Sequence, residues 1–225
     1  MNLILGAQIF IFEQINHNIM NNVNFKPWIG KNYLSLGLGG KRILVLGESH
    51  YCTDCEKCER KVMSEECHAF TENIINSYVY NYSGEKYEQT FLCFERALAG
   101  KVLTQEEREA LWNSMAFYNY IQIAQTGPRQ ELVNSPESEP AFLEVLEELA
   151  PDAIIVWGRR LYNTLPDWNG LHSTLKEIDG YQADVWIYDI DGKNIPALAV
   201  DHPSCPRGKN WEFWHKVIKT FLERI

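Results

Sequence analysis

The segment RILVLGESH, residues 42–50, gives the clearest indication of how this chain folds. Its apolar run, Ile43–Leu46, is rich in residues that favour strands, and a glycine, Gly47, ends it, as is typical of a short buried β-strand. Three polar residues, Glu48, Ser49 and His50, follow at once. The segment therefore predicts a buried strand whose end opens into a polar site.

Similar strand signals alternate with helical ones along the rest of the chain. The pair Asp191-Gly192 separates two β-rich runs and favours a hairpin. Ser138 and Asn210 each precede an amphipathic pattern, where a polar side chain can cap a helix. The further predicted strands are 115–123, 152–158 and the hairpin arms within 184–200, and the main predicted helices are 70–81, 85–100, 140–150 and 211–225.

This alternation predicts an α/β protein, in which helices cover the faces of a parallel sheet. We expect a three-layer α/β/α sandwich with a central, mainly parallel four-stranded sheet. No shift in composition divides the chain, so residues 1–225 are predicted to form a single domain with a cysteine-rich insert at about 52–68. Sheets of this kind place ligands at the carboxyl ends of their strands.

The charge balance narrows the range of partners. The 225 residues carry a formal net charge of -9, which argues against a protein that coats duplex DNA, because neutralising many phosphates requires many Lys and Arg side chains. A local basic site on an acidic body remains compatible with this charge. The N-terminus lacks the basic region of a signal peptide, and no apolar run is long enough to span a membrane. We therefore expect a cytoplasmic, monomeric protein with no membrane partner.

The predicted strand ends carry side chains suited to recognition or chemistry. Glu48 and His50 could position water or exchange protons, or else cap a helix and bind a loop. Asn119 offers both a donor and an acceptor, which matches the edge of a nucleobase, although a buried Asn can equally pair with neighbouring backbone. His202 could donate to a developing oxyanion, or else stabilise the tight turn before Pro203.

The cysteines form a separate pattern, Cys52-x2-Cys55-x2-Cys58-x8-Cys67. Four thiolates within a short segment can enclose Zn²⁺ tetrahedrally. The closely spaced first three also resemble the loop around a [4Fe-4S] cluster. Four protein ligands leave zinc no open position, so we expect a structural metal, zinc or iron–sulfur; four reduced cysteines are the alternative.

Taken in order, the strand ends resemble those of the uracil-DNA glycosylase superfamily. The resemblance is dispersed over about residues 41–221 and consists of short motifs. ILVLGES is similar to the first family motif, in the form that carries Gly-Glu, and HAFTEN to the segment that supplies a stacking aromatic. FYNYIQ, with GPR downstream, resembles the strand that bears the base-binding Asn. The last two motifs are FLEVLEELAPDAIIVWG, similar to a helix–strand–Gly unit, and DHPSCPRGKNW, similar to the His-Pro-Ser motif of the single-strand-selective type.

The resemblance implies that the partner is DNA containing a damaged or deaminated base, which must leave the stack to be reached. Phe70 would stack on that base, and Asn119 would bind its edge, with Ser49 and His50 beside it. His202 would stabilise the departing base, and Glu48 would position water or favour a cationic sugar. The residues implied to contact DNA are Ser204, Pro206, Arg207 and Lys209.

Two positions depart from the family pattern. Ser49 stands where the strongest catalytic carboxylate is found, and His50 replaces the usual Pro. The cysteines are also distributed differently from those of the family members that carry an iron–sulfur cluster. These departures motivate an alternative function, a noncatalytic nucleotide- or nucleic-acid-binding protein on the same fold with a structural metal site.

Overall fold

The segment at 42–50 forms the predicted strand, β2 (Ile43–Gly47), and every residue of this strand is buried. A computed structural model describes residues 20–52, 65–125, 136–204 and 210–225. β2 lies between two parallel neighbours, β3 (Met115–Asn119) and β4 (Ala153–Trp157), which are buried along their whole length as well. Strands with no solvent-facing side are apolar throughout, because helices cover both faces of the sheet.

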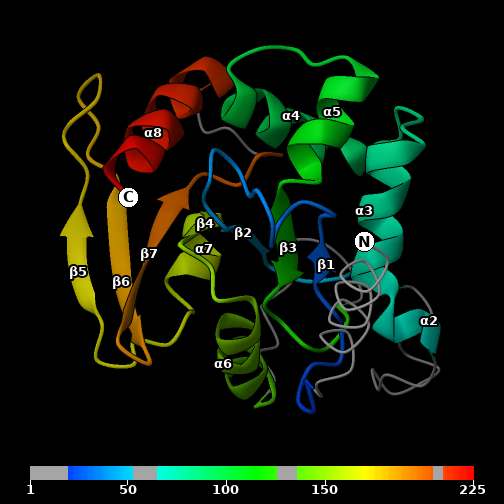
Figure 1. Ribbon diagram of the computed structural model, residues 1–225, viewed down its shortest axis with the longest axis horizontal. Coiled ribbons are helices and arrows are strands. Elements are labelled where there is room, and N and C mark those ends of the chain that lie inside the picture. Colours follow the sequence, from blue (N-terminus) through cyan, green and yellow to red (C-terminus); the bar gives the residue numbers. More distant parts are fainter. Residues whose placement is uncertain (1–19, 53–64, 126–135, 205–209) are drawn as a thin grey trace, which may run out of the picture.

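The sheet has seven strands in the order β1-β3-β2-β4-β7-β6-β5 (Figure 1). Four of them, β3, β2, β4 and β7, are parallel to one another, and the remaining strands pair antiparallel at the two edges. The prediction of four mainly parallel strands is therefore wrong for the whole sheet, which is mixed, although four parallel strands form its centre. The fourth parallel strand is β7 (Lys193–Val200), and the antiparallel strands at the edges are β1 (Trp28–Ile29), β5 (Leu171–Thr174) and β6 (Asp184–Ile190).

Two apolar clusters lie on opposite faces of the sheet. Alternate strand residues such as Val45 and Ile155 pack with one group of helices, whereas Leu44 and Ile154 pack with the other. Figure 1 shows α4 and α8 above the sheet and α6 below it. The first group contains α3 (Phe70–Tyr80), α4 (Glu88–Ala99), α5 (Gln105–Trp112) and α8 (Trp211–Arg224), and the second contains α6 (Ser138–Leu149) and the short α7 (Arg159–Tyr162). One further short helix, α2 (Glu65–His68), precedes α3.

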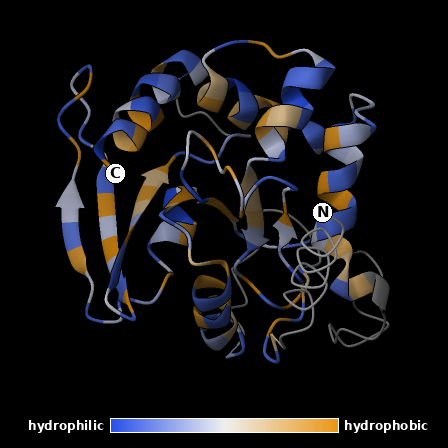
Figure 2. Cartoon of the chain, in the orientation of Figure 1, coloured by the Kyte–Doolittle hydropathy of each residue, from blue (hydrophilic) through white to orange (hydrophobic). Residues whose placement is uncertain are grey.

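Helix α8 shows why its sequence folds onto the sheet. Its buried residues, Trp214, Val217, Ile218 and Phe221, recur at helical spacing, and Figure 2 shows hydrophobic and hydrophilic residues interspersed along α8. The predicted cap is present, because the side chain of Asn210 accepts a hydrogen bond from the backbone N–H of Phe213 at 3.0 Å.

The other turn and cap predictions are mostly confirmed. Asp191 and Gly192 both have positive φ, as the predicted hairpin turn between β6 and β7 requires. Gly100 ends α4 in the left-handed conformation. The predicted cap at Ser138 is wrong: Ser138 is already the first residue of α6, and its hydroxyl accepts instead from the backbone N–H of Gln122.

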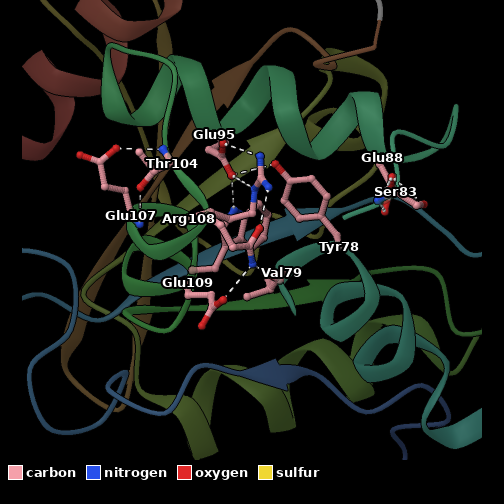
Figure 3. A network of polar contacts seen from close by, with 11 residues as sticks. Tyr78, Val79, Ser83, Glu88, Glu95, Thr104, Glu107, Arg108 and Glu109 are labelled. Atoms are coloured by element: carbon pink, nitrogen blue, oxygen red, sulfur yellow. Dashed lines mark hydrogen bonds and ion pairs between the residues drawn. The ribbon is translucent and has the colours of Figure 1, made fainter. Parts of the chain in front are cut away.

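A buried ion pair joins α4 to α5 (Figure 3). Glu95 is fully buried and its Oε2 accepts from Arg108 Nε at 2.9 Å, from the Tyr78 hydroxyl at 2.7 Å and from Trp112 Nε1 at 3.2 Å. The guanidinium of Arg108 also lies over the rings of Tyr78 and Tyr82. A carboxylate with this many donors can be kept charged inside the protein.

Among the helices that the structure describes, none is long and apolar enough to cross a membrane.

Candidate functional site at the carboxyl ends of the parallel strands

The polar residues singled out in the sequence follow parallel strands that end at the same edge of the sheet. Gly47, the last residue of β2, is in register with Asn119, the last of β3. On the other side, Trp157 at the end of β4 is in register with Val200 at the end of β7. Beyond the sheet, the chain segments continue side by side, since Tyr51 pairs with Gln125. The structure therefore brings the predicted residues of separate motifs to one edge.

The amide of Asn119 lies directly against β2. A Cβ atom added at Gly47 would collide with Oδ1 of Asn119 and would lie 2.8 Å from Cζ of Phe117. Only glycine therefore leaves room for the amide at this register. The Asn119 side chain is buried with its carbonyl oxygen over Gly47 and its Nδ2 toward His50.

His50 is buried, with 5% of its surface exposed, and holds the Asn119 amide in place. Its Nε2 lies 2.8 Å from the hydroxyl of Thr71, and the Asn119 Nδ2 lies 3.3 Å from both ring nitrogens. Burial lowers the pKa of His50 to about 3, so the ring is neutral at physiological pH. Because the amide nitrogen can only donate, one ring nitrogen of the neutral His50 accepts from Asn119. Nε2 donates to the Thr71 hydroxyl in one tautomer and accepts from it in the other.

Two aromatic rings enclose His50. Phe25 and Phe70 contact it edge-on, with ring centroids 4.6 and 4.8 Å away. Phe70, the predicted stacking residue, is the first residue of α3 and lies next to Thr71 in sequence. His50 thus links the predicted stacking aromatic to the predicted base-binding amide.

Glu48 forms an ion pair with Arg160 of α7. Arg160 Nε donates to Oε2 of Glu48 at 2.8 Å, and Arg160 Nη2 donates to Oε1. Only 10% of the Glu48 side chain is exposed, whereas 49% of the Arg160 side chain is. Arg160 therefore orients the Glu48 carboxylate from the solvent side. The hydroxyl of Ser49 is buried, and no residue in the described parts of the chain provides it with a hydrogen-bond partner.

His202 lies past the end of β7, over the last residue of β4. Its ring packs edge-on against Trp157, with centroids 6.3 Å apart, and its Cβ approaches Gly158. The backbone N–H of Ser204 points at Nδ1 at 3.3 Å, and the Ser204 hydroxyl lies 2.8 Å from the same atom. A backbone N–H can only donate, so Nδ1 is the acceptor and Nε2 carries the proton.

The charge state of His202 is set by its surroundings. Burial lowers its pKa, and the nearby Arg160 lowers it further, whereas the charge of Glu48 acts in the opposite direction. A neutral imidazole with a fixed Nε2–H is a hydrogen-bond donor that gains no charge of its own at physiological pH. These influences also mean that Glu48 and His202 lie within electrostatic reach of each other.

The cysteine loop is described only at its ends. Cys52 and Cys67 both pack against the small apolar cluster of Phe25 and Ala124, where Phe70 also packs. Cys55 and Cys58 lie outside the described residues. These two cysteines thus lie against the same small cluster. No group of three metal-binding side chains occurs among the described residues.

The predicted DNA-contacting segment is also only partly described. Ser204 is exposed and its hydroxyl bonds to His202, while Pro206, Arg207 and Lys209 lie outside the described residues.

Sequence reasoning did not assign three residues that help to build the site. Thr71 fixes the ring of His50, Arg160 binds Glu48, and Gln122 accepts from the backbone N–H groups of Asn24 and Phe25 at 2.8 and 3.0 Å. Only Arg160 had a usable signal, as a basic residue just after the Gly158 strand end. The partners of the others come from distant segments that no local pattern connects.

A substitution at Gly47 tests the packing of the Asn119 amide. Gly47→Ala should lower the free energy of unfolding by about 1–3 kcal/mol, since the new methyl group overpacks the strand end. In an Asn119→Ala background the same substitution should cost less, because one of its two collisions is gone. Urea unfolding of the four proteins in this cycle measures the difference; equal costs in both backgrounds would contradict the contact.

The chain matches no protein-family model, and no curated protein matches it either. The fold defines the class of protein: it is an α/β protein with a seven-stranded mixed sheet.

Proposed function

We propose that the protein is a DNA N-glycosylase of the uracil-DNA glycosylase type, which hydrolyses the bond between deoxyribose and uracil or a related damaged base. The observation that carries the proposal is a neutral His202, held with Nε2–H as its donor, at the same sheet edge as the Asn119 amide. A donor for a departing base and an amide for its edge are the two groups that such a reaction needs most.

The spacing of the strands supports this division of roles. Asn119 ends β3 and His202 follows β7, with β2 and β4 between them. Neighbouring strands are about 4.8 Å apart, so the two strand axes are separated by about 14 Å. Glu48 directly follows β2, so it lies between the strands that carry these two groups.

Base recognition would rest on the Asn119 amide, whose orientation is fixed by its contact with His50. Because Nδ2 gives one of its two protons to His50, the other proton and Oδ1 form the donor–acceptor pair for a base edge. An amide held in one orientation distinguishes uracil from cytosine, whose donors and acceptors are exchanged. Phe70 would supply the aromatic contact.

The proposed reaction is a hydrolysis that needs no oxidant or reductant. As the bond from C1′ to the base nitrogen breaks, its electron pair leaves with the base, and the sugar gains positive charge. The Nε2–H of His202 donates a hydrogen bond to the base anion, and the Glu48 carboxylate stabilises the sugar cation and orients the attacking water. The water oxygen bonds to C1′, and its released proton neutralises the base anion through solvent.

The Glu48–Arg160 ion pair is compatible with this role. Arg160 is half exposed, so a DNA phosphate can attract its guanidinium. That would leave Glu48 free to face the sugar without altering the strand end that holds it.

The decisive experiment is an excision assay. The protein is incubated with single- and double-stranded oligonucleotides that contain uracil or another deaminated base, and abasic sites are detected by alkaline strand cleavage. We expect cleavage at uracil, lost in Asn119→Ala and retained in the exposed-surface variant Lys216→Ala. Intact oligonucleotides for every modified base would contradict the proposal.

A second candidate is a noncatalytic nucleotide- or nucleic-acid-binding protein on the same fold. The ion pair that occupies Glu48 and the serine at position 49 favour it. It predicts oligonucleotide binding that survives both Glu48→Ala and His202→Ala, with no abasic sites formed.

The structural metal, zinc or an iron–sulfur cluster, stays part of the proposal. Its support is that Cys52 and Cys67 pack beside Phe70. A metal held there would brace the start of α3 and hence the aromatic ring, and no reaction step depends on it.

A further inference from the structure

A second cavity, apart from the strand-end cluster, opens beside the antiparallel side of the sheet. It has a volume of about 380 Å³, and its lining includes Tyr162, Asn163, Asp167, His172, Asp184 and Trp186. Ligand pockets commonly have volumes of about 300–1,000 Å³, aromatic walls and a few polar groups. The size and lining of this cavity fit one planar, hydrogen-bonding group.

The walls of the cavity are formed in advance. Gly170 packs so closely on Trp186 that a Cβ would collide with the indole. Trp186 Nε1 in turn donates to the carbonyl of Asp167 at 3.2 Å. Trp168 and Asn169 both have positive φ, a costly backbone conformation that persists at sites the surrounding structure holds in place. The loop between α7 and β5 is therefore locked onto β6.

One group in the cavity lacks a partner within the described parts of the chain. The hydroxyl of Tyr162 is buried and makes no hydrogen bond there. Burial raises the pKa of Tyr162 to about 12, so the hydroxyl keeps its proton and can donate. Buried polar groups are nearly always paired, and a ligand in the cavity would supply the missing partner.

The charges in the cavity exclude a phosphate as its occupant. Asp184 and Asp167 both line it. Asp184 is held by an ion pair with Arg159 and lies 3.3 Å from His172. Two carboxylates repel an anion, while the aromatic rings of Trp186 and Tyr162 suit an uncharged heterocycle. The occupant that fits is a neutral nucleobase.

The two arginines that begin α7 connect this cavity to the strand-end cluster. Arg160 binds Glu48 in the cluster, and Arg159, the residue before it, binds Asp184 in the cavity wall. Both guanidinium groups are partly exposed. Each place thus has a partly exposed guanidinium from one of two adjacent residues, and a phosphodiester that links two nucleosides could contact both.

We propose that this cavity binds the base of a nucleotide next to the one that is excised, so that the substrate is a strand rather than a free nucleoside. The proposal rests on the proposed function for the identity of the strand. It assigns the Tyr162 hydroxyl as a donor to the neighbouring base and the two arginines as contacts for the linking phosphate.

Tyr162→Phe separates this role from a structural one. Removing an unpaired buried hydroxyl should raise the melting temperature in the absence of DNA. The same change should weaken binding of a short uracil-containing oligonucleotide about tenfold, which is the loss of affinity expected when one hydrogen bond is removed. Fluorescence anisotropy measures binding without catalysis, and Tyr87→Phe, on the far face at α4, is the matched control that should leave affinity unchanged.

A substrate change completes the test. An abasic analogue is placed next to the uracil, on either side in turn. On one side it should weaken binding of the oligonucleotide to the wild type about tenfold. For Tyr162→Phe, the abasic-flanked and the intact oligonucleotides should bind equally well. Equal affinity of the wild type for intact and abasic-flanked strands would overturn the cavity proposal even where uracil is excised. Tyr162-dependent binding without excision would support the cavity while contradicting the glycosylase.

Discussion

Glu95→Ala should lower the free energy of unfolding by about 3–5 kcal/mol, because it leaves the Arg108 charge buried without its partner. Glu95 is fully buried and accepts from Arg108, Tyr78 and Trp112, so the substitution also removes the acceptor of two further donors. These residues belong to α3, α4 and α5 (Figure 3). The loss should therefore loosen the contacts among all three helices.

Urea denaturation followed by circular dichroism measures this loss. Glu147→Ala, which removes an exposed carboxylate from α6, is the matched control and should change stability by less than about 0.5 kcal/mol. Replacing Glu95 and Arg108 together by leucine and methionine should recover part of the loss, because no unpaired charge then remains. A loss below about 1 kcal/mol for Glu95→Ala would mean that water reaches the pair.

His202→Ala should reduce the rate of uracil excision by about 100- to 1,000-fold, the usual cost of removing one preorganised donor to a developing anion. The loss should appear in kcat and much less in KM, because the base carries the negative charge only in the transition state. Ser204→Ala should have a smaller effect, since the backbone N–H of Ser204 still holds Nδ1.

Single-turnover kinetics with a uracil-containing oligonucleotide measures the chemical step directly. Thermal unfolding of the variant checks that the fold is kept, and Lys216→Ala on the exposed side of α8 should excise at the wild-type rate. If Ser204→Ala lowered the rate as much as His202→Ala does, the loss would come from the broken contact between these two residues in the loop. The Nε2–H donor would then not be its cause. A normal rate in His202→Ala would remove it from the reaction.

The sequence was a good guide to elements that local patterns specify. The apolar run before Gly47, the Asn210 cap and the Asp191-Gly192 turn are all found as predicted. Each depends on residues within one strand, one helical turn or one hairpin. The physics is local, so the sequence contains it directly.

The edge strands could not be predicted in the same way. β1 has two residues and β5 has four, too few for a periodic pattern. They become strands because β3 and β6 offer unpaired backbone groups next to them. The predicted helix cap at Ser138 was wrong for the same reason. Its hydroxyl accepts a hydrogen bond from the backbone N–H of Gln122, sixteen residues away.

The sequence by itself determined where β2 and β4 end, because a glycine closes each apolar run. The strand predicted over 115–123 ends earlier, at Asn119, where the local pattern gives no stop. Only the tertiary structure decided what the residues at these strand ends contact. Glu48 meets Arg160 across 112 residues, and Asn119 meets His50 across 69. Such pairs depend on the order of strands in the sheet, which is set by the burial of both faces and not by any local pattern. That order turns separate motifs into a single candidate site.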